Sequence, residues 1–141
     1  MTETELAYMA GIFDGEGCLT VLKNKTKHAA GCVPNYSVNV IVSMTSEPVT
    51  SWLKDKVPGS WVSIRVGGAN GKNRDIYRWG ITGIRAVELV RLVAPYLVEK
   101  SRQAELISTI GPYLTGRGKF PTQEQLDAKE DIYCQLKALH L

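Results

Sequence analysis

Two acidic residues stand close together near the amino terminus, where an apolar stretch gives way to glycine-rich sequence. They are Asp14 and Glu16, in the segment Ala7–Gly17. We expect them at the carboxyl end of a helix, where the helix dipole disfavours each negative charge by roughly 0.3–1 kcal/mol. A hard divalent cation would relieve this cost, because it prefers carboxylate, carbonyl and water oxygens, and helix ends carry free carbonyls. The pattern indicates a metal-binding acid; solvated surface acids are the structural alternative.

The same segment carries small residues at every fourth position: Ala7, Gly11 and Gly15. Each glycine inside a helix costs roughly 0.8–1 kcal/mol relative to alanine. A stripe without side chains permits unusually close approach by another helix. The alternative is that it packs on its own core, although apolar residues elsewhere on the helix already supply a core face. The sequence has no internal repeat, so the expected partner is a second copy related by a twofold axis. Parallel packing would bring two copies of Glu16 together.

The remaining sequence predicts the elements that must position this helix. β-Branched residues alternate with polar ones in the expected strands, and Thr4, Ser46 and Thr122 are predicted helix caps, with Gln125 completing a capping box after Thr122. The predicted elements are a helix over 5–15, strands over 18–23 and 36–43, a helix from 46 to about 56, strands over 61–66 and 75–81, and helices over 84–94, 98–110 and 122–139.

The links between these elements indicate how the strands pair. A polar loop with Gly31 and Pro34 is predicted between the first two strands, and Asn70-Gly71 favours a hairpin between the next two. Each strand pair is joined too briefly for a crossover, so the strands should be antiparallel. The predicted class is α+β in the order αββαββααα, as a single domain over 1–141 with a core at about 4–113 and a C-terminal helix at about 122–139.

Composition narrows the class of protein. With 141 residues, 44% hydrophobic and 22% charged, the chain is typical of one compact globular domain, and its net charge of +3 permits a polyanionic partner without demanding one. We expect no membrane span, because no apolar run reaches about 18 residues. Acids stand where a signal peptide would need basic residues. Three cysteines and two histidines without metal-ligand spacing argue against zinc. They favour a reducing intracellular compartment: cytoplasm, organelle matrix or phage-infected host, not secretion.

The glycine run over 67–72 could be mistaken for a phosphate-binding loop. Gly67 and Gly71 are separated by three residues rather than four, and Asn73 follows Lys72 where such loops need serine or threonine. The sequence therefore argues against nucleotide phosphate binding at this loop.

The segment Met9–Gly17 resembles the LAGLIDADG motif of homing endonucleases. Ala10, Gly11, Asp14 and Gly17 match the motif, Met9, Ile12 and Phe13 are apolar replacements, Gly15 is a small-residue variant, and Glu16 stands where the motif usually has its second aspartate. The αββαββ order extends the resemblance to about residue 110. The resemblance implies a homing-endonuclease-like fold with a saddle-shaped, antiparallel four-stranded sheet. A chain with one motif is expected to act as a homodimer through its first helix.

The resemblance also implies the activity and the site. The expected function is hydrolysis of both strands of a long pseudo-palindromic DNA target, with Mg²⁺ (or Mn²⁺ or Ca²⁺) held by Glu16 and the carbonyl of Gly15. Lys100 falls where the family carries a catalytic basic residue, with surface lysine as the alternative. Ser46, or its neighbour Thr45, falls where a polar residue orients water, although Ser46 is also predicted as a helix cap.

Strand alternation then predicts the DNA contacts. We expect Trp61 and Ile64 in the core, with Tyr77 and Trp79 also pointing inward. Arginine can pair with guanine and asparagine with adenine, whereas Lys23, Lys25 and Lys27 are predicted as phosphate contacts or as a solvated loop. The predicted DNA-binding residues are Thr20, Asn24, Lys25, Asn39, Ser43, Ser63, Arg65, Lys72, Arg74, Ile76 and Arg78.

Two alternatives belong to other functional classes. One is an RNA maturase of the LAGLIDADG type, which assists intron splicing without cutting DNA. The other is a DNA-binding regulator that has lost cleavage. The acid at position 16 and the lysine at position 100 favour the enzyme.

Overall fold

The computed structural model describes residues 1–28, 31–68, 73–116 and 119–140. The predicted order αββαββααα and the α+β class are confirmed, with two short 3₁₀ helices added. The elements are α1 (Glu3–Glu16), β1 (Gly17–His28), β2 (Gly31–Met44), α2 (Glu47–Lys56), β3 (Trp61–Arg65), β4 (Ile76–Thr82), α3 (Ile84–Val93), η1 (Ala94–Tyr96), α4 (Ser101–Ile110), η2 (Gly111–Tyr113) and α5 (Gln123–Leu139). No helix in the described residues is long and apolar enough to cross a membrane.

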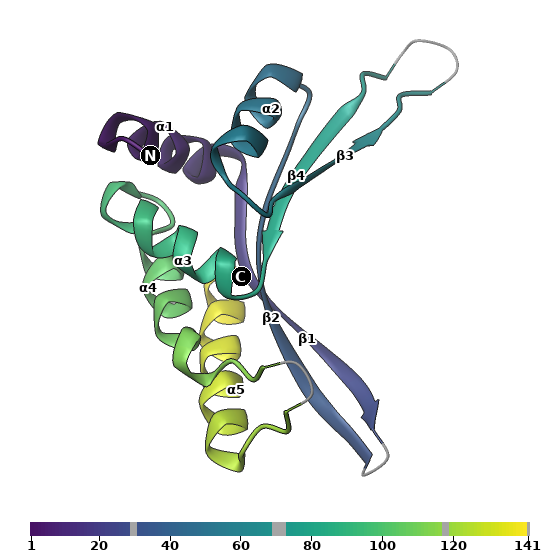
Figure 1. Cartoon of the computed structure of the whole chain (residues 1–141), viewed down its shortest axis with the longest axis vertical. Coiled ribbons are helices and arrows are strands. Elements are labelled where there is room, and N and C mark those ends of the chain that lie inside the picture. Colours follow the sequence, from purple (N-terminus) through teal and green to yellow (C-terminus); the bar gives the residue numbers. More distant parts are fainter. Residues whose placement is uncertain (29–30, 69–72, 117–118, 141) are drawn as a thin grey trace.

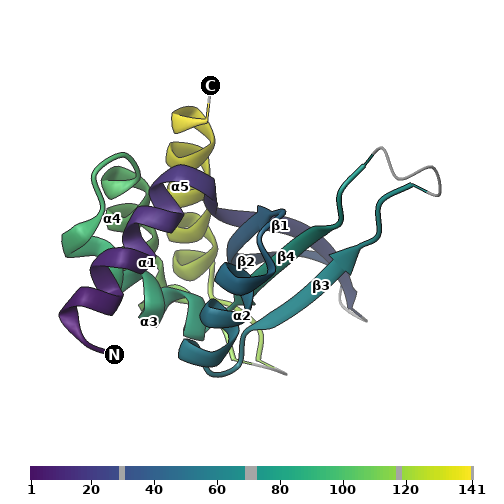
Figure 2. The same ribbon diagram turned by 90° about the horizontal axis from the view of Figure 1, so that it is seen from above.

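The four strands form one antiparallel sheet in the order β1-β2-β4-β3. Helices α1, α3, α4 and α5 lie on one side of this sheet, and the two hairpins flare away from them, so the opposite face is open (Figure 1). Figure 2 shows the β3–β4 hairpin projecting well beyond the helices. We call the helix-covered side of the sheet the inner face and the other side the outer face.

Alternate strand residues bury the inner face against the helices. Leu19, Val40 and Trp79 are fully buried there, and Phe13 of α1 stacks on Trp79 with ring centroids 5.7 Å apart. The core cluster continues into α3, α4 and α5. Helix α1 is thus anchored through one face. Its position relative to the sheet is fixed by the aromatic pair.

Three predicted boundaries were wrong in the first part of the chain: the start of the first helix, the end of the first strand and the start of the second strand. Helix α1 begins at Glu3 because Thr2, not Thr4, is its cap: the Thr2 hydroxyl accepts from the backbone N–H of Glu5 at 3.1 Å. The predicted loop with Gly31 and Pro34 belongs to a long β1–β2 hairpin, in which Pro34 pairs with Lys25. Pairing between β2 and β4 covers only residues 39–44 of β2, so β2 has one neighbour at Pro34. A proline is tolerated in such a position.

Helix boundaries later in the chain were partly correct. The capping box of Thr122 and Gln125 is confirmed. Ser46 occupies the predicted cap position of α2, but its side chain makes no capping hydrogen bond. The predicted helix start at Val98 was wrong, because α4 begins at Ser101. The preceding turn holds its backbone N–H groups toward α1, as described below.

Helix α5 docks on β1 and β2 through a polar cluster that we call the α5 junction, made of Lys23, Tyr36, Glu130 and Tyr133. The Lys23 ammonium lies 2.7 Å from the Glu130 carboxylate, and the Tyr36 hydroxyl donates to the same carboxylate. The hydrogen bond from Lys23, and then that from Tyr36, lowers the pKa of Glu130. Burial is the main cause that raises the pKa of Tyr36. The interpretation of Lys23 as a phosphate contact or solvated residue was wrong, because α5 supplies its partner.

Candidate functional site

The carboxyl end of α1 turns directly into β1. The N–H of Gly17 donates to the carbonyl of Phe13, and a side chain at Gly17 would lie 2.7 Å from the Phe13 backbone. Only glycine permits this exit without a shift of the helix. Glu16 is therefore held at the junction of the first helix and the first strand.

Asp14 has partners within the chain. Its carboxylate accepts from the backbone N–H of Val98 at 2.8 Å and from that of Lys100 at 3.0 Å. The negative charge of Asp14 is therefore compensated within the chain. Hydrogen bonds from the turn before α4 satisfy this carboxylate, and hydrogen bonds to a charged group contribute about 1.5–3 kcal/mol each.

Lys100 faces the same helix end. Its ammonium donates to the carbonyl of Asp14 at 2.6 Å. A cation at the carboxyl end of a helix interacts favourably with the helix dipole. The structure therefore brings together two of the predicted site positions, Lys100 and the end of α1 that carries Glu16.

Glu16 has no such partner. It is exposed and makes no hydrogen bond or ion pair with the part of the chain that the structure describes. Gly15, the predicted carbonyl ligand, lies beside it in the last turn, where helix carbonyls lack intrahelical donors. No cluster of three or more His, Cys, Asp or Glu side chains occurs in the described residues. The donor set of one chain fits a hard divalent cation through oxygen ligands, but other oxygens must complete the coordination.

Ser46 and Thr45 lie on the link between β2 and α2. The Ser46 carbonyl accepts from Thr50, and no hydrogen bond joins its side chain to Asp14 or Lys100 in the described residues. Thr45 lines a pocket of about 520 Å³ at the loop end of the β3–β4 hairpin. A role for either residue in orienting water stays a prediction.

The outer face of the sheet is polar at most of its predicted positions. Strand register places Thr20 beside Asn39, and places Arg78 between Ser43 and Ser63. Among the described residues, the Arg78 guanidinium makes no hydrogen bond or ion pair, and it is exposed. Asn39 differs from Arg78 because it is buried, with only 8% of its surface exposed.

The prediction that Trp61 and Ile64 lie in the core was wrong, because both are exposed, Ile64 over 57% of its surface. Trp61 and Ile64 have opposite parity in β3, so both cannot face the core. Trp61 pairs with Gly80, and a Cβ at Gly80 would collide with the Trp61 ring and lie 2.7 Å from the Ile41 side chain. Trp61 and Ile41 therefore cover Gly80 on the outer face. Glycine at position 80 is what admits the indole there, and Trp61 keeps 37% of its surface exposed.

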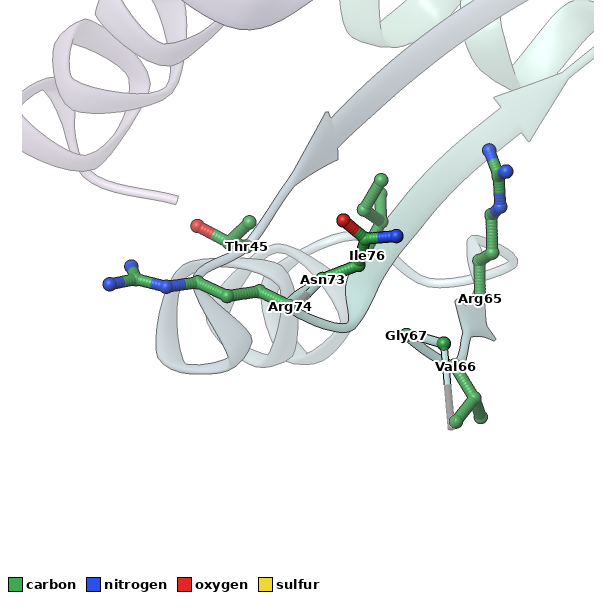
Figure 3. Close-up of a pocket in the computed structure, with 8 residues that line it drawn as sticks. Thr45, Arg65, Val66, Gly67, Asn73, Arg74 and Ile76 are labelled. Atoms are coloured by element: carbon green, nitrogen blue, oxygen red, sulfur yellow. The ribbon is translucent and has the colours of Figure 1, made fainter. Parts of the chain in front are cut away.

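The loop end of the β3–β4 hairpin, where the paired strands give way to the connecting loop, forms the pocket that contains Thr45. It is lined by Arg65, Arg74 and Ile76, together with Val66, Gly67, Gly68 and Asn73. The two guanidinium groups point in different directions from its rim (Figure 3). Predicted residue Lys72 and the Asn70-Gly71 turn lie outside the described residues.

The edge of β1 offers a second groove, of about 260 Å³. Thr20 and Asn24 line it from the strand, and Lys137 and His140 line it from the end of α5. The sequence did not indicate these two basic residues, because nothing local places α5 beside β1. Lys25, a predicted DNA contact, is exposed. It lies on the same side of β1 as the buried Val21, so it belongs to the inner face rather than to the outer face.

The small-residue stripe of α1 is uncovered. Ala7, Gly11 and Gly15 are exposed, and a Cβ built at either glycine would meet no atom within 4 Å. Tyr8 beside the stripe is 52% exposed and makes an edge-to-face contact with Trp52 of α2. The alternative in which the stripe packs on the chain's own core was therefore wrong.

No protein-family model matches the chain, and no curated protein matches its sequence. Among solved structures it is similar to the homing endonuclease I-CvuI in complex with its target in the presence of calcium, at 17% identity and a TM-score of 0.77, over 96% of this chain and 82% of that one. It is also similar to the archaeal intron-encoded homing endonuclease I-Vdi141I complexed with DNA, at 14% identity and a TM-score of 0.73, over 96% and 84%.

A third similar structure is the I-LtrWI LAGLIDADG homing endonuclease bound to target DNA, at 16% identity and a TM-score of 0.71. This chain is covered over 96% of its length but spans only 45% of that one. At these identities the likeness establishes the fold. The expectation drawn from the motif and from the element order is confirmed at that level: the chain has the fold of the LAGLIDADG homing endonucleases.

Proposed function

We propose that the chain is a site-specific DNA endonuclease that acts as a homodimer with a divalent metal ion and hydrolyses both strands of its target. The observation that carries this proposal is the exposed carboxylate of Glu16, which has no partner among the described residues and lies beside the uncovered stripe of α1. An acid left without partners at a helix end is costly unless something outside the chain binds it. The homing-endonuclease fold supplies the class of substrate, and the similar proteins were solved with DNA.

The stripe gives the proposed dimer its geometry. Two copies of α1 packed in parallel through Ala7, Gly11 and Gly15 would place both Glu16 carboxylates near one twofold axis. A twofold relation between two acids matches the two strands of a pseudo-palindromic duplex. Each acid would then serve one strand.

The proposed cleavage site uses three groups of the chain. Glu16, with the Gly15 carbonyl, would hold Mg²⁺, and Mn²⁺ or Ca²⁺ could occupy the same site. A bound Mg²⁺ supplies Lewis-acid stabilisation of the phosphoryl oxygens and a more acidic water. Lys100 lies at the same helix end, and its ammonium would stabilise negative charge on the reacting phosphate.

The outer face of the sheet is the proposed DNA-binding surface. Its polar rows, with Arg78 between two serines, can hydrogen-bond to base edges in the major groove. Arg65 and Arg74, on either side of the loop of the projecting hairpin, can reach bases or phosphates. Polar side chains that have no partner in the described part of the chain are available to a partner outside it.

The test is selection of cleaved molecules from a randomised duplex library with purified protein and Mg²⁺. The proposal predicts enrichment of one pseudo-palindromic site with a cut in each strand. A library in which no site is cut would contradict the nuclease. Retained specific binding without cleavage would then point to the regulator, and stimulated splicing of a host intron would point to the maturase.

A further inference from the structure

Asp14 and Lys100 bind one another through two hydrogen bonds, and the backbone N–H of Val98 donates a third to Asp14. The Asp14 carboxylate accepts from the backbone N–H groups of Val98 and Lys100, at 2.8 and 3.0 Å, and the Lys100 ammonium donates to the Asp14 carbonyl at 2.6 Å. The side chain of each residue therefore bonds to the backbone of the other, across two segments that are far apart in the sequence.

This reciprocal contact determines where the lysine charge lies. The turn before α4 has no side-chain cap of its own, because Lys100 occupies the cap position without a capping hydrogen bond. The Asp14 carboxylate accepts from the backbone N–H groups of Val98 and Lys100 instead, and so fixes the backbone from which the Lys100 side chain starts. The Asp14 carbonyl then fixes the ammonium at the other end of that side chain.

An ammonium has three donors. One Lys100 donor is used on the Asp14 carbonyl, so two donors are left for a phosphate. That phosphate would lie beside Glu16, which follows Asp14 by two residues in α1. A long, flexible lysine would otherwise sample many rotamers, and small misplacement of a reacting group lowers rate strongly. The contact thus orders the cation without neutralising it by a carboxylate.

We propose that Asp14 is a positioning residue of the cleavage site, which holds the Lys100 ammonium at the end of α1 that carries Glu16. The inference rests on the proposed function. It assigns the two acids of the motif different roles: Glu16 faces the substrate, and Asp14 acts through Lys100. A purely architectural alternative is that Asp14 only ties α1 to α4.

A double-mutant cycle separates these roles. Asp14→Asn keeps the size of the side chain but offers one acceptor oxygen instead of two. Its single-turnover cleavage rate should fall about 10- to 100-fold, the range expected for a misplaced group. DNA affinity, measured in Ca²⁺ so that cleavage does not interfere, should stay within about twofold, because Asp14 makes no substrate contact.

The second arm of the cycle uses Lys100→Met. In that background Asp14→Asn should cost less than about twofold, because the two residues act as one unit. An architectural role would give the same loss in both backgrounds, and that outcome would overturn the proposal. Asp14→Glu keeps the charge and should recover part of the rate. It also serves as the test variant if Asp14→Asn does not fold, which a thermal melt detects.

A second measurement does not need cleavage. Competitive labelling with an amine-reactive reagent, read by mass spectrometry, reports how free each lysine is. Asp14→Asn should raise the labelling rate of Lys100 severalfold relative to the exposed Lys119, and unchanged labelling would overturn the proposal. If the wild type cleaves no DNA, the proposed function fails, and the labelling ratio still decides whether Asp14 positions Lys100.

Discussion

The two carboxylates Glu16 and Glu130 have opposite surroundings in the same chain. At the α5 junction, Glu130 accepts from Lys23 and Tyr36, and the Cys134 thiol lies 3.6 Å from it. At the end of α1, Glu16 makes no hydrogen bond or ion pair with the described residues. Glu130, whose partners are side chains of the same chain far from the end of α1, serves the fold. An acid without such partners is available to an external ligand.

Chelation of the metal should have the largest effect of all the changes considered, and it should affect cleavage at the end of α1 without affecting the stability of the fold. Cleavage of a selected target should fall about a thousandfold or more in EDTA, since metal stabilisation of the transition state represents several kcal/mol. The melting temperature of the free protein should not change, because the Asp14 carboxylate is already bonded within the chain and no acidic cluster occurs in the described residues. Plasmid linearisation and a thermal melt measure the two effects. A melting temperature that drops in EDTA would mean that the site is structural.

Gly11→Leu should disrupt the dimer. A leucine at this exposed position fills the space through which the second helix would approach. Sedimentation velocity should then report the 15.5 kDa monomer, with loss of double-strand cleavage. Glu124→Leu, which adds the same side chain to an exposed position of α5, is the control and should remain dimeric. An unchanged mass for Gly11→Leu would contradict the proposed interface.

Two arginines sharpen the description of the outer face. Arg78→Ala should relax specificity at one base pair, by the roughly 1–3 kcal/mol of a bidentate contact. Arg74→Ala, just before the start of β4, should instead reduce the slope of log affinity against log salt by about 0.9, as one lost phosphate contact does. Binding to a variant library at several salt concentrations distinguishes them. If both variants change only the slope, Arg78 does not read bases.

Glu130→Gln should have the smallest effect, and only on stability. Lys23 is the main cause of the lowered pKa of Glu130, so the charged form stabilises the fold above the ordinary glutamate value of 4.5. This stabilisation is lost as the pH falls through the lower pKa of the folded state. The denaturation midpoint should therefore be lower than in the wild type at pH 7, and the difference should disappear at acidic pH. A difference that grows in acid would contradict the assigned sign.

The sequence predicted what depends on local pattern. The element order follows from local patterns along the chain. The stripe of α1 and the acid at position 16 follow from spacing within the single segment Ala7–Gly17. The turn before α4 could not be predicted, because its N–H groups bond to Asp14, more than eighty residues earlier. The partner of Lys23 comes from α5 in the same way. Trp61 was misassigned because an indole looks like a core residue. Gly80, on the neighbouring strand, makes room for it on the outer face.

One crossed measurement tests the central claim that Glu16 serves cleavage and Glu130 serves the fold. Glu16→Gln and Glu130→Gln remove the same charge and are compared in two assays, Mg²⁺-dependent cleavage and chemical denaturation. We predict that Glu16→Gln abolishes cleavage while DNA binding and stability stay at wild-type values, and that Glu130→Gln lowers stability while cleavage by the folded protein stays within about twofold. Wild-type cleavage by Glu16→Gln would contradict the account.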